Sequence, residues 1–194
     1  QDSPPGDDTK YALIGLPVDV DPAPVAFGLT ADPGRTLAMI GDGRDDAAAD
    51  VVVLPGATKD VAAVARLCHE TRIPLVPRGG GTGYTGGAVP VHGGVVLSLE
   101  RMNRILEIDE QNRMAVVEPG VITGDFQREV EARGLFYPPD PASHQFCTLG
   151  GNIAECAGGL RAVKYGVTRD YILGLEVVLP TGEVIETGAR TPKS

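Results

Sequence analysis

The sequence predicts an α+β protein built from two lobes, and three observations support this class. An apolar β-branched run at residues 51–55 precedes an amphipathic stretch at 58–68, and a second apolar run follows at 73–77, which is the pattern of a parallel strand–helix–strand unit. Two later pairs of apolar runs, at 102–120 and 173–187, are each joined by a polar turn, which predicts antiparallel hairpins. With 194 residues, 42% of them apolar, the chain can bury a sizeable core, and its length suits one domain or two small lobes.

The chain divides into three parts by composition. Residues 1–48 are rich in proline, aspartate and glycine, so we expect a loosely structured lead. Residues 49–110 are expected to form the first lobe, with a parallel sheet, and residues 111–194 the second, with a mixed and largely antiparallel sheet. Because the sequence begins with Gln1 and stops just after a strand-like segment, we expect a fragment of a longer protein.

Two helices are predicted from capping residues and apolar spacing. Thr58 occupies the position of an N-cap, and the helix that follows is expected to stop before Pro74. Thr123 is expected to cap a second helix, which carries Phe126 on its apolar face and ends at Gly134. The apolar face of this second helix should pack on the sheet.

Residues 77–87, between two predicted strands, form the most informative stretch of the chain. Six of these eleven residues are glycine, and glycine lets backbone N–H groups converge because it accepts positive φ and has no Cβ. Arg78 adds a guanidinium that matches the geometry of phosphate oxygens. The stretch therefore predicts an anion site. The structural alternative is a glycine-rich turn or linker, but this loop opens at the carboxyl end of a strand, where α/β sheets bind ligands.

Two common phosphate-binding motifs do not explain this loop. The spacing G-x-G-x-x-G occurs at residues 81–86, but the dinucleotide-binding fold needs a helix that starts inside that motif. Pro90 and a Gly-Gly pair stand where the interior of the helix would be. A P-loop needs a lysine at its end, and no lysine lies between residues 59 and 164.

Two later segments can also bring backbone against a ligand. The proline-rich stretch 137–143 suits neither a helix nor a strand, so we expect a fixed, extended loop. It leads into a second glycine-rich segment at 148–154, and a glycine pair recurs at 158–159. Several backbone surfaces could thus converge on one elongated cofactor that carries phosphate.

Four ordered motifs resemble those of the FAD-linked oxidases. They are Pro-Arg-Gly-Gly-Gly-Thr-Gly at 77–83, Pro-Pro-Asp-Pro at 138–141, Thr-Leu-Gly-Gly-Asn-Ile-Ala-Glu at 148–155 and Lys-Tyr-Gly-Val-Thr-Arg-Asp-Tyr at 164–171. Within this vanillyl-alcohol-oxidase group the sequence is most similar to the glycolate oxidase GlcD subunit and to the D-lactate and D-2-hydroxyglutarate dehydrogenases. The resemblance covers residues 50–194 and implies a PCMH-type FAD-binding domain of two α/β lobes.

The resemblance implies an oxidoreductase in which FAD accepts a hydride from the α-carbon of a 2-hydroxy acid and the 2-oxo acid is formed. The small substrate would bind through a cap domain. That cap, like the family's Glu-Gly-Thr-Leu-Gly cofactor motif, would follow Ser194. We therefore name no catalytic residue in this segment, which alone is expected to be inactive, and the electron acceptor or partner subunit stays open.

The resemblance also implies which residues hold FAD. The first glycine loop would meet the pyrophosphate, the proline loop and the second glycine segment would line the ribityl chain and the isoalloxazine, and a late strand would meet the adenine. The implied contacts are Arg78, Gly79, Gly80, Gly81, Thr82, Gly83, Gly87, Pro139, Asp140, Pro141, Ser143, Thr148, Gly150, Gly151, Asn152, Ala154, Gly158, Gly159 and Val178. Lys164 is a weaker candidate.

The sequence departs from the family pattern at two positions. Thr82 stands at the level where some relatives carry the histidine that attaches FAD covalently, so non-covalent FAD is expected. Cys156 stands where relatives often carry asparagine, which puts a polar contact there in doubt.

Composition limits the partners and the compartment. A net charge of −9, with five Tyr, four Phe and no Trp, argues against a nucleic-acid surface. No apolar run approaches the roughly 18 residues of a membrane span, and the N-terminus does not resemble a signal peptide. We expect a cytoplasmic protein, peripheral at the inner membrane if it meets a membrane at all. The three cysteines include no C-x-x-C pair, so reduced thiols and no metal site are expected.

Three other functions stay open at this point. A non-catalytic flavin-binding or scaffold subunit of an oxidoreductase complex would share the same motifs. An FAD-dependent nucleotide-sugar reductase of the MurB type shares the fold that the resemblance implies. In a structural alternative, the glycine loops are only turns in a partner-binding domain.

Overall fold

The computed structural model describes residues 49–189. The lead at residues 1–48, for which the sequence predicts loose structure, lies outside the described residues. In chain order the elements are β1 (Val51–Val53), α1 (Thr58–Thr71), β2 (Leu75–Arg78), β3 (Val95–Ser98), the 3₁₀ helix η2 (Leu99–Arg101), β4 (Ile105–Asp109), β5 (Met114–Val117), α2 (Thr123–Glu131), α3 (Leu149–Ala154), α4 (Ala162–Tyr165), the 3₁₀ helix η3 (Thr168–Tyr171), β6 (Gly174–Val178) and β7 (Val184–Gly188).

The first sheet is parallel and has the order β1-β3-β2. Val51 of β1 and Leu75 of β2 both pair with Val95 of β3. The predicted strand–helix–strand unit is present, but β3 separates its two strands. Because β3 is paired on both sides, its side chains at Val96 and Leu97 are fully buried, as expected for the central strand of a parallel sheet.

This topology positions the glycine-rich stretch. Strands β2 and β3 are parallel neighbours, so residues 79–94 must run from the carboxyl end of β2 back to the amino end of β3. Such a return usually contains a helix. Here the connection contains no helix, as the prolines and glycines of the sequence predict. The backbone N–H groups of this loop are therefore not used in helical hydrogen bonds and can bind a ligand.

Helix α1 covers the parallel sheet through a small apolar face. Val61, Ala65 and Cys68 are buried on this face, and Val61 and Ala65 belong to the core that also contains Leu97 and Met102. The predicted N-cap at Thr58 is wrong, because Thr58 is the first residue of the helix and Ala57 precedes it as the N-cap.

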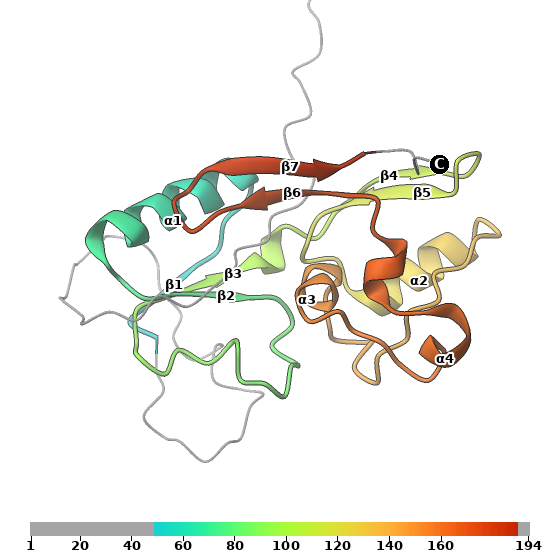
Figure 1. The fold of residues 1–194 in the computed structure, drawn as a ribbon, viewed down its shortest axis with the longest axis horizontal. Coiled ribbons are helices and arrows are strands. Elements are labelled where there is room, and N and C mark those ends of the chain that lie inside the picture. The colour runs from blue at the N-terminus through green and yellow to red at the C-terminus, as the bar shows by residue number, and fades with distance from the viewer. Residues whose placement is uncertain (1–48, 190–194) are drawn as a thin grey trace, which may run out of the picture.

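Two antiparallel hairpins make up the second layer, as predicted. Strand β4 pairs with β5, and β6 pairs with β7 through Val178 and Val184. A second core lies under the β4–β5 hairpin and includes Val117, Phe126 and Leu149. In Figure 1 the hairpins run along one side of the molecule, with α2, α3 and α4 grouped below β4 and β5.

The two layers are joined by the packing of β6 on α1, and the β4–β5 hairpin is closed at its base by a buried carboxylate. Val178 of β6 is fully buried in the α1 core, so the far end of the β6–β7 hairpin packs on α1. Glu118, just after β5, is 0% exposed. Its carboxylate accepts hydrogen bonds from the backbone N–H of Arg104 at 2.7 Å and from the Arg104 guanidinium at 2.7 and 3.1 Å, which fixes the start of the β4–β5 hairpin to its end.

Within residues 49–189, no helix combines the length and the apolar character that crossing a membrane requires.

Candidate functional site

The loop after β2 presents unused backbone donors. None of the N–H groups of residues 80–87 donates a hydrogen bond to a residue that the structure describes. Two glycines in this stretch, Gly81 with φ +67° and Gly86 with φ +76°, have left-handed backbone, which only glycine adopts at little cost. Residues 83–85 are exposed and residues 80–82 half-buried. The loop thus carries donors that a ligand with several acceptor oxygens would satisfy.

Arg78 supplies the positive charge beside these donors. Its side chain folds over the loop, since a Cβ built on Gly81 would lie 3.2 Å from Arg78 Nε. Among the described residues, Arg78 has no carboxylate as an ion-pair partner. Its neighbour in the sheet is Ser98, whose buried Oγ has no hydrogen-bond partner in the same part of the chain. Within residues 49–189, a guanidinium and a hydroxyl therefore lie unpaired on adjacent strands.

The two glycine-rich segments contact each other directly. A Cβ on Gly79 would overlap Thr148 Oγ1 and lie 3.7 Å from the Gly151 nitrogen. A Cβ on Gly80 would overlap the carbonyl oxygen of Phe146. Residues far apart in sequence thus form one continuous backbone surface, and the absence of side chains at Gly79 and Gly80 makes this contact possible.

The second segment forms the short helix α3, which the sequence did not predict. Thr148 is its N-cap, and Thr148 Oγ1 accepts a hydrogen bond from the Gly151 N–H at 3.2 Å. Gly150 is buried against Pro119, with its N–H donating to the Pro119 carbonyl at 2.9 Å, and a Cβ on Gly150 would lie 2.6 Å from Pro119 Cβ. Packing within the chain thus accounts for Gly150 being a glycine.

The Asn152 side chain also forms a hydrogen bond within the protein. Asn152 is 3% exposed, and its Nδ2 donates to Thr123 Oγ1 at 2.6 Å, while Thr123 Oγ1 donates to the Cys147 carbonyl at 3.2 Å. The predicted N-cap role of Thr123 is wrong: Thr123 is the first residue of α2, and Ile122 is the N-cap. Fully buried, Thr123 instead connects α2 to α3.

The proline-rich loop is held by hydrogen bonds, in line with the fixed loop that the sequence predicts. The buried Pro139 carbonyl accepts from Gln127 Nε2 at 2.8 Å, and His144 Nδ1 lies 3.3 Å from the Pro141 carbonyl. Asp140 Oδ1 accepts from the Arg161 N–H at 2.9 Å. The Ser143 carbonyl accepts from two backbone N–H groups further along, which closes the turn that leads into α3.

The glycine pair at 158–159 joins this loop as well. Gly159 has φ +145° and packs so tightly on Asp140 that a Cβ there would overlap the Asp140 backbone. Gly158 is half-buried and faces Ala162 and Val167. Asp140 and Gly159 are therefore brought together from two separate predicted segments.

The remaining predicted residues differ in their surroundings. Thr82 is half-buried, whereas Gly83, Gly87 and Ala154 are exposed. Val178 belongs to the α1 core with its side chain fully buried, so only its backbone is left for a ligand.

Sequence reasoning missed three residues that shape this site: Ser98, Pro119 and Phe146. The turn Glu118-Pro119-Gly120 was visible after a predicted strand, and a proline directly beyond a strand marks a fixed backbone. The contact between Pro119 and Gly150 is a tertiary contact, which local sequence patterns do not predict. Ser98 and Phe146 carried no signal in the sequence.

A phosphate-bearing cofactor fits these features. Unpaired N–H groups, an unpaired guanidinium and backbone surfaces without side chains are what a pyrophosphate and a flat ring system require. The fold and the site therefore define a domain that binds a large nucleotide cofactor.

Comparison with known proteins identifies the family of this cofactor-binding domain. The sequence profile of the FAD binding domain family matches residues 49–188, so the chain belongs to this family and FAD is its cofactor. It is 55% identical over 144 residues to the glycolate oxidase subunit GlcD of Bacillus subtilis, covering 74% of this chain and 31% of that protein. It is 49% identical over 158 residues to a D-lactate dehydrogenase of Anaerostipes hadrus, and the match covers 81% of this chain and 32% of that protein. The chain thus spans about a third of the length of these curated relatives.

A solved structure supports the fold. The chain superimposes on p-cresol methylhydroxylase with a TM-score of 0.63 and 32% sequence identity, covering 74% of this chain and 28% of the other. The α+β fold of the PCMH type, expected from the resemblance, is confirmed.

Proposed function

We propose that this chain is the FAD-binding part of an oxidoreductase that converts a 2-hydroxy acid into the corresponding 2-oxo acid. The observation that carries the proposal is the row of N–H groups at residues 80–87 beside the Arg78 guanidinium, all without a partner among the described residues. A row of this kind, in a family that binds FAD, suits the pyrophosphate of the cofactor.

Each part of the site receives one part of the cofactor in this proposal. The loop of residues 78–83, with Gly87, holds the pyrophosphate. Residues 139–143 and 148–154 line the ribityl chain and the isoalloxazine, with the glycine pair at 158–159 close by, and the backbone of Val178 meets the adenine. We propose further that residues 49–110 and 111–194 are the two lobes between which the cofactor lies.

Attachment of the cofactor is proposed to be non-covalent. Thr82 has a hydroxyl where a covalent link of this kind would need an imidazole, and the nearest histidine along the loop is His92, which is exposed. Purification under denaturing conditions tests this point, because FAD should then separate from the polypeptide.

The names of the relatives support the substrate class. One similar protein is a glycolate oxidase subunit and another a D-lactate dehydrogenase, and both glycolate and D-lactate are 2-hydroxy acids. When bound, FAD supplies the redox chemistry by accepting the hydride that leaves the α-carbon, and this chain supplies binding and orientation. We propose that the groups that hold the substrate carboxylate and take the hydroxyl proton belong to a substrate cap outside residues 1–194.

A second candidate is a flavin-binding subunit without catalytic activity of its own. One relative is named as a subunit, which favours a place in a larger complex for this chain too. A reductase of the MurB type is the third candidate. We further propose a cytoplasmic protein, peripheral at the inner membrane if it meets a membrane at all, which cell fractionation tests.

The experiment that tests the proposed function uses the complete gene product. We expect the purified protein to show flavin absorbance, and we expect D-2-hydroxy acids to bleach it under anaerobic conditions while NADPH does not. Bleaching by NADPH alone would favour the reductase. A flavin that no 2-hydroxy acid reduces would favour the non-catalytic subunit, and a colourless protein unable to bind added FAD would contradict all three candidates.

A further inference from the structure

The hydroxyl oxygen of Ser98 stands apart from the other buried polar atoms of the side chains. Ser98 is the last residue of β3 and is 1% exposed. Among the buried side-chain nitrogen and oxygen atoms of residues 49–189, Ser98 Oγ is the one without a hydrogen-bond partner. Buried hydroxyls nearly always have a partner, and an unsatisfied one destabilises the folded state. Such an atom indicates a partner that this part of the chain does not supply.

Ser98 and Arg78 lie on the same face of the parallel sheet. The residue before Ser98, Leu97, belongs to the core under α1, and successive residues of a strand point to opposite faces, so Ser98 points away from α1. Arg78 ends β2 and is the register partner of Ser98. The two side chains therefore project from one face at the carboxyl ends of both strands, where the loop of residues 79–94 begins.

The requirements of the fold alone do not explain a serine at this position. Val96 and Leu97, which precede it on β3, are fully buried and apolar, and an apolar side chain at residue 98 would remove an unsatisfied buried hydroxyl. A carboxylate would form an ion pair with Arg78 and so occupy the guanidinium. Serine does neither, because it leaves the charge of Arg78 available and adds a donor of its own.

A phosphate oxygen is a partner that suits both side chains. A guanidinium only donates hydrogen bonds and a hydroxyl can donate one, so an anionic oxygen placed beside them accepts from both. The N–H groups of residues 80–87, which follow Arg78, also lack partners among the residues that the structure describes. The hydroxyl, the guanidinium and these N–H groups lie at the carboxyl ends of parallel strands, where α/β sheets bind ligands.

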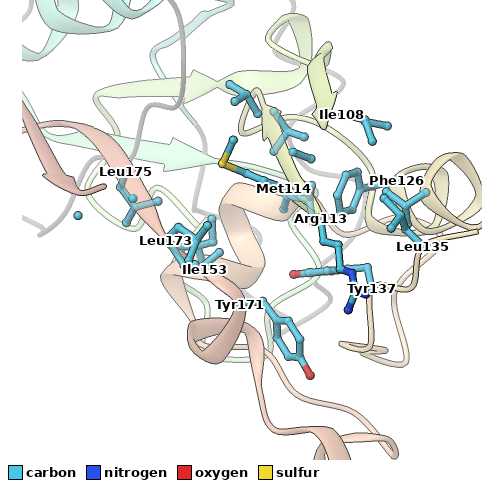
Figure 2. Close-up of a pocket in the computed structure, with 18 of the residues that line it drawn as sticks. Ile108, Arg113, Met114, Phe126, Leu135, Tyr137, Ile153, Tyr171, Leu173 and Leu175 are labelled. Atoms are coloured by element: carbon cyan, nitrogen blue, oxygen red, sulfur yellow. The ribbon is translucent and has the colours of Figure 1, made fainter. Parts of the chain in front are cut away.

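The apolar cleft between the two hairpins and the helices α2 and α3 offers phosphate no comparable site. Its volume is about 690 Å³, and Figure 2 shows apolar side chains on both sides of it, among them Phe126 and Leu173. The charged lining consists of one cation, Arg113, and two carboxylates, Glu176 and Glu186. A phosphate group would meet repulsion there, and no residue of the loop after β2 lines this cleft.

We propose that the Ser98 hydroxyl donates a hydrogen bond to a phosphate oxygen of FAD, next to the Arg78 guanidinium. The inference rests on the proposed function, because it takes FAD as the ligand of the loop after β2. Ser98 Oγ has almost no exposed surface, so the chain around it moves when the phosphate binds. The loop is suited to this movement, since its N–H groups hold no hydrogen bonds to described residues and the left-handed Gly81 and Gly86 flank its tip.

Ser98→Ala in the complete, flavin-depleted gene product tests the proposal by two effects of opposite sign. Without flavin, the urea midpoint of the variant should be at least as high as that of the wild type, because an unsatisfied buried hydroxyl is gone. The Kd for FAD, measured by flavin fluorescence, should rise about tenfold or more, since a hydrogen bond to a charged group is lost. The Kd for riboflavin, which has no phosphate, should stay unchanged.

Thr58→Val is the matched control. Thr58 is also buried, but its hydroxyl has a partner within the chain and donates to Glu176 Oε1 at 2.5 Å. Removing this hydroxyl should lower the urea midpoint of the flavin-free protein and leave the Kd for FAD unchanged. A hydroxyl with a structural role alone gives this result, which is the reverse of the one expected for Ser98.

Three results would overturn the role of Ser98. They are a Ser98→Ala variant that binds FAD as tightly as the wild type, one that binds FAD and riboflavin more weakly by the same factor, and one that is destabilised without flavin as Thr58→Val is. Failure of the proposed function is distinguishable from these results. A wild-type protein that binds FAD but is reduced by no 2-hydroxy acid would contradict the proposed activity and leave the role of Ser98 standing, whereas a wild-type protein that binds no FAD would contradict both.

Discussion

Gly79 and Thr148 lie so close together that a Cβ on Gly79 would overlap the hydroxyl oxygen of Thr148. The same oxygen caps α3 by accepting a hydrogen bond from the Gly151 N–H at 3.2 Å. The loop after β2 and the first turn of α3 are thus in contact through the Thr148 side chain. A displacement of one segment must move the other, so the two halves of the proposed flavin site are expected to respond together to substitution.

Gly80→Ala should disrupt this contact. The added methyl group would overlap the backbone carbonyl of Phe146, which cannot rotate away as a side chain could. We expect a loss of about 1–3 kcal/mol in the free energy of unfolding and FAD binding weakened by at least tenfold, measured by urea denaturation and by flavin fluorescence. Gly56→Ala is the matched control, because Gly56 is exposed, lies outside the proposed site, and its nearest neighbour would be 3.7 Å from the new Cβ. Equal effects of the two substitutions would refute the packing explanation.

Glu118→Gln should destabilise the fold. The carboxylate is buried and accepts a charged pair of hydrogen bonds from Arg104 together with the Arg104 backbone N–H. Gln keeps the shape but loses the charge, so we expect the free energy of unfolding to fall by about 1–3 kcal/mol. Asp125→Asn on the exposed surface of α2 is the control, since its ion pair with Arg128 is solvated and worth little. A Glu118 variant as stable as the control would contradict this role.

The stability of the protein should decline in alkaline solution between about pH 9 and pH 11. Burial raises the pKa of the Cys68 thiol from 9.0 to about 11, so the unfolded chain loses this proton at lower pH than the folded protein. In that window the folded state binds more protons, and stability therefore falls as pH rises. Urea midpoints at several pH values measure the decline, which should be smaller in Cys68→Ala. An identical decline in both proteins would mean that Cys68 does not contribute to it.

Part of the fold was accessible from the sequence because its signals are local. The apolar runs and polar turns predicted both hairpins, and Pro90 with its following glycines predicted that no helix follows the loop after β2. The central place of β3 was not predictable, because which strands pair is decided by tertiary packing and leaves no mark on a single segment.

In the site, too, the features with local signals could be predicted from the sequence and the tertiary contacts could not. Arg78 and the glycines around it could be chosen because anion binding needs those residue types. The hydrogen bond between the buried side chains of Asn152 and Thr123 could not be foreseen. The packing of Gly150 on Pro119 could not be foreseen either. The sequence alone does not distinguish a glycine that leaves room for a cofactor from one that leaves room for another part of the chain.

The central claim is that the loop after β2 binds the pyrophosphate of FAD, and the affinities of FAD and riboflavin for the complete, flavin-depleted protein test it most directly. Riboflavin lacks the pyrophosphate, so we predict that the wild-type protein binds FAD more tightly and that Arg78→Ala weakens FAD binding by about 1.5–3 kcal/mol, roughly 10- to 150-fold, with little effect on riboflavin. Arg128→Ala, on the exposed surface of α2, should change neither affinity. Equal affinity of the wild-type protein for both flavins, or an Arg78→Ala variant that binds FAD as tightly as the wild type, would contradict the account.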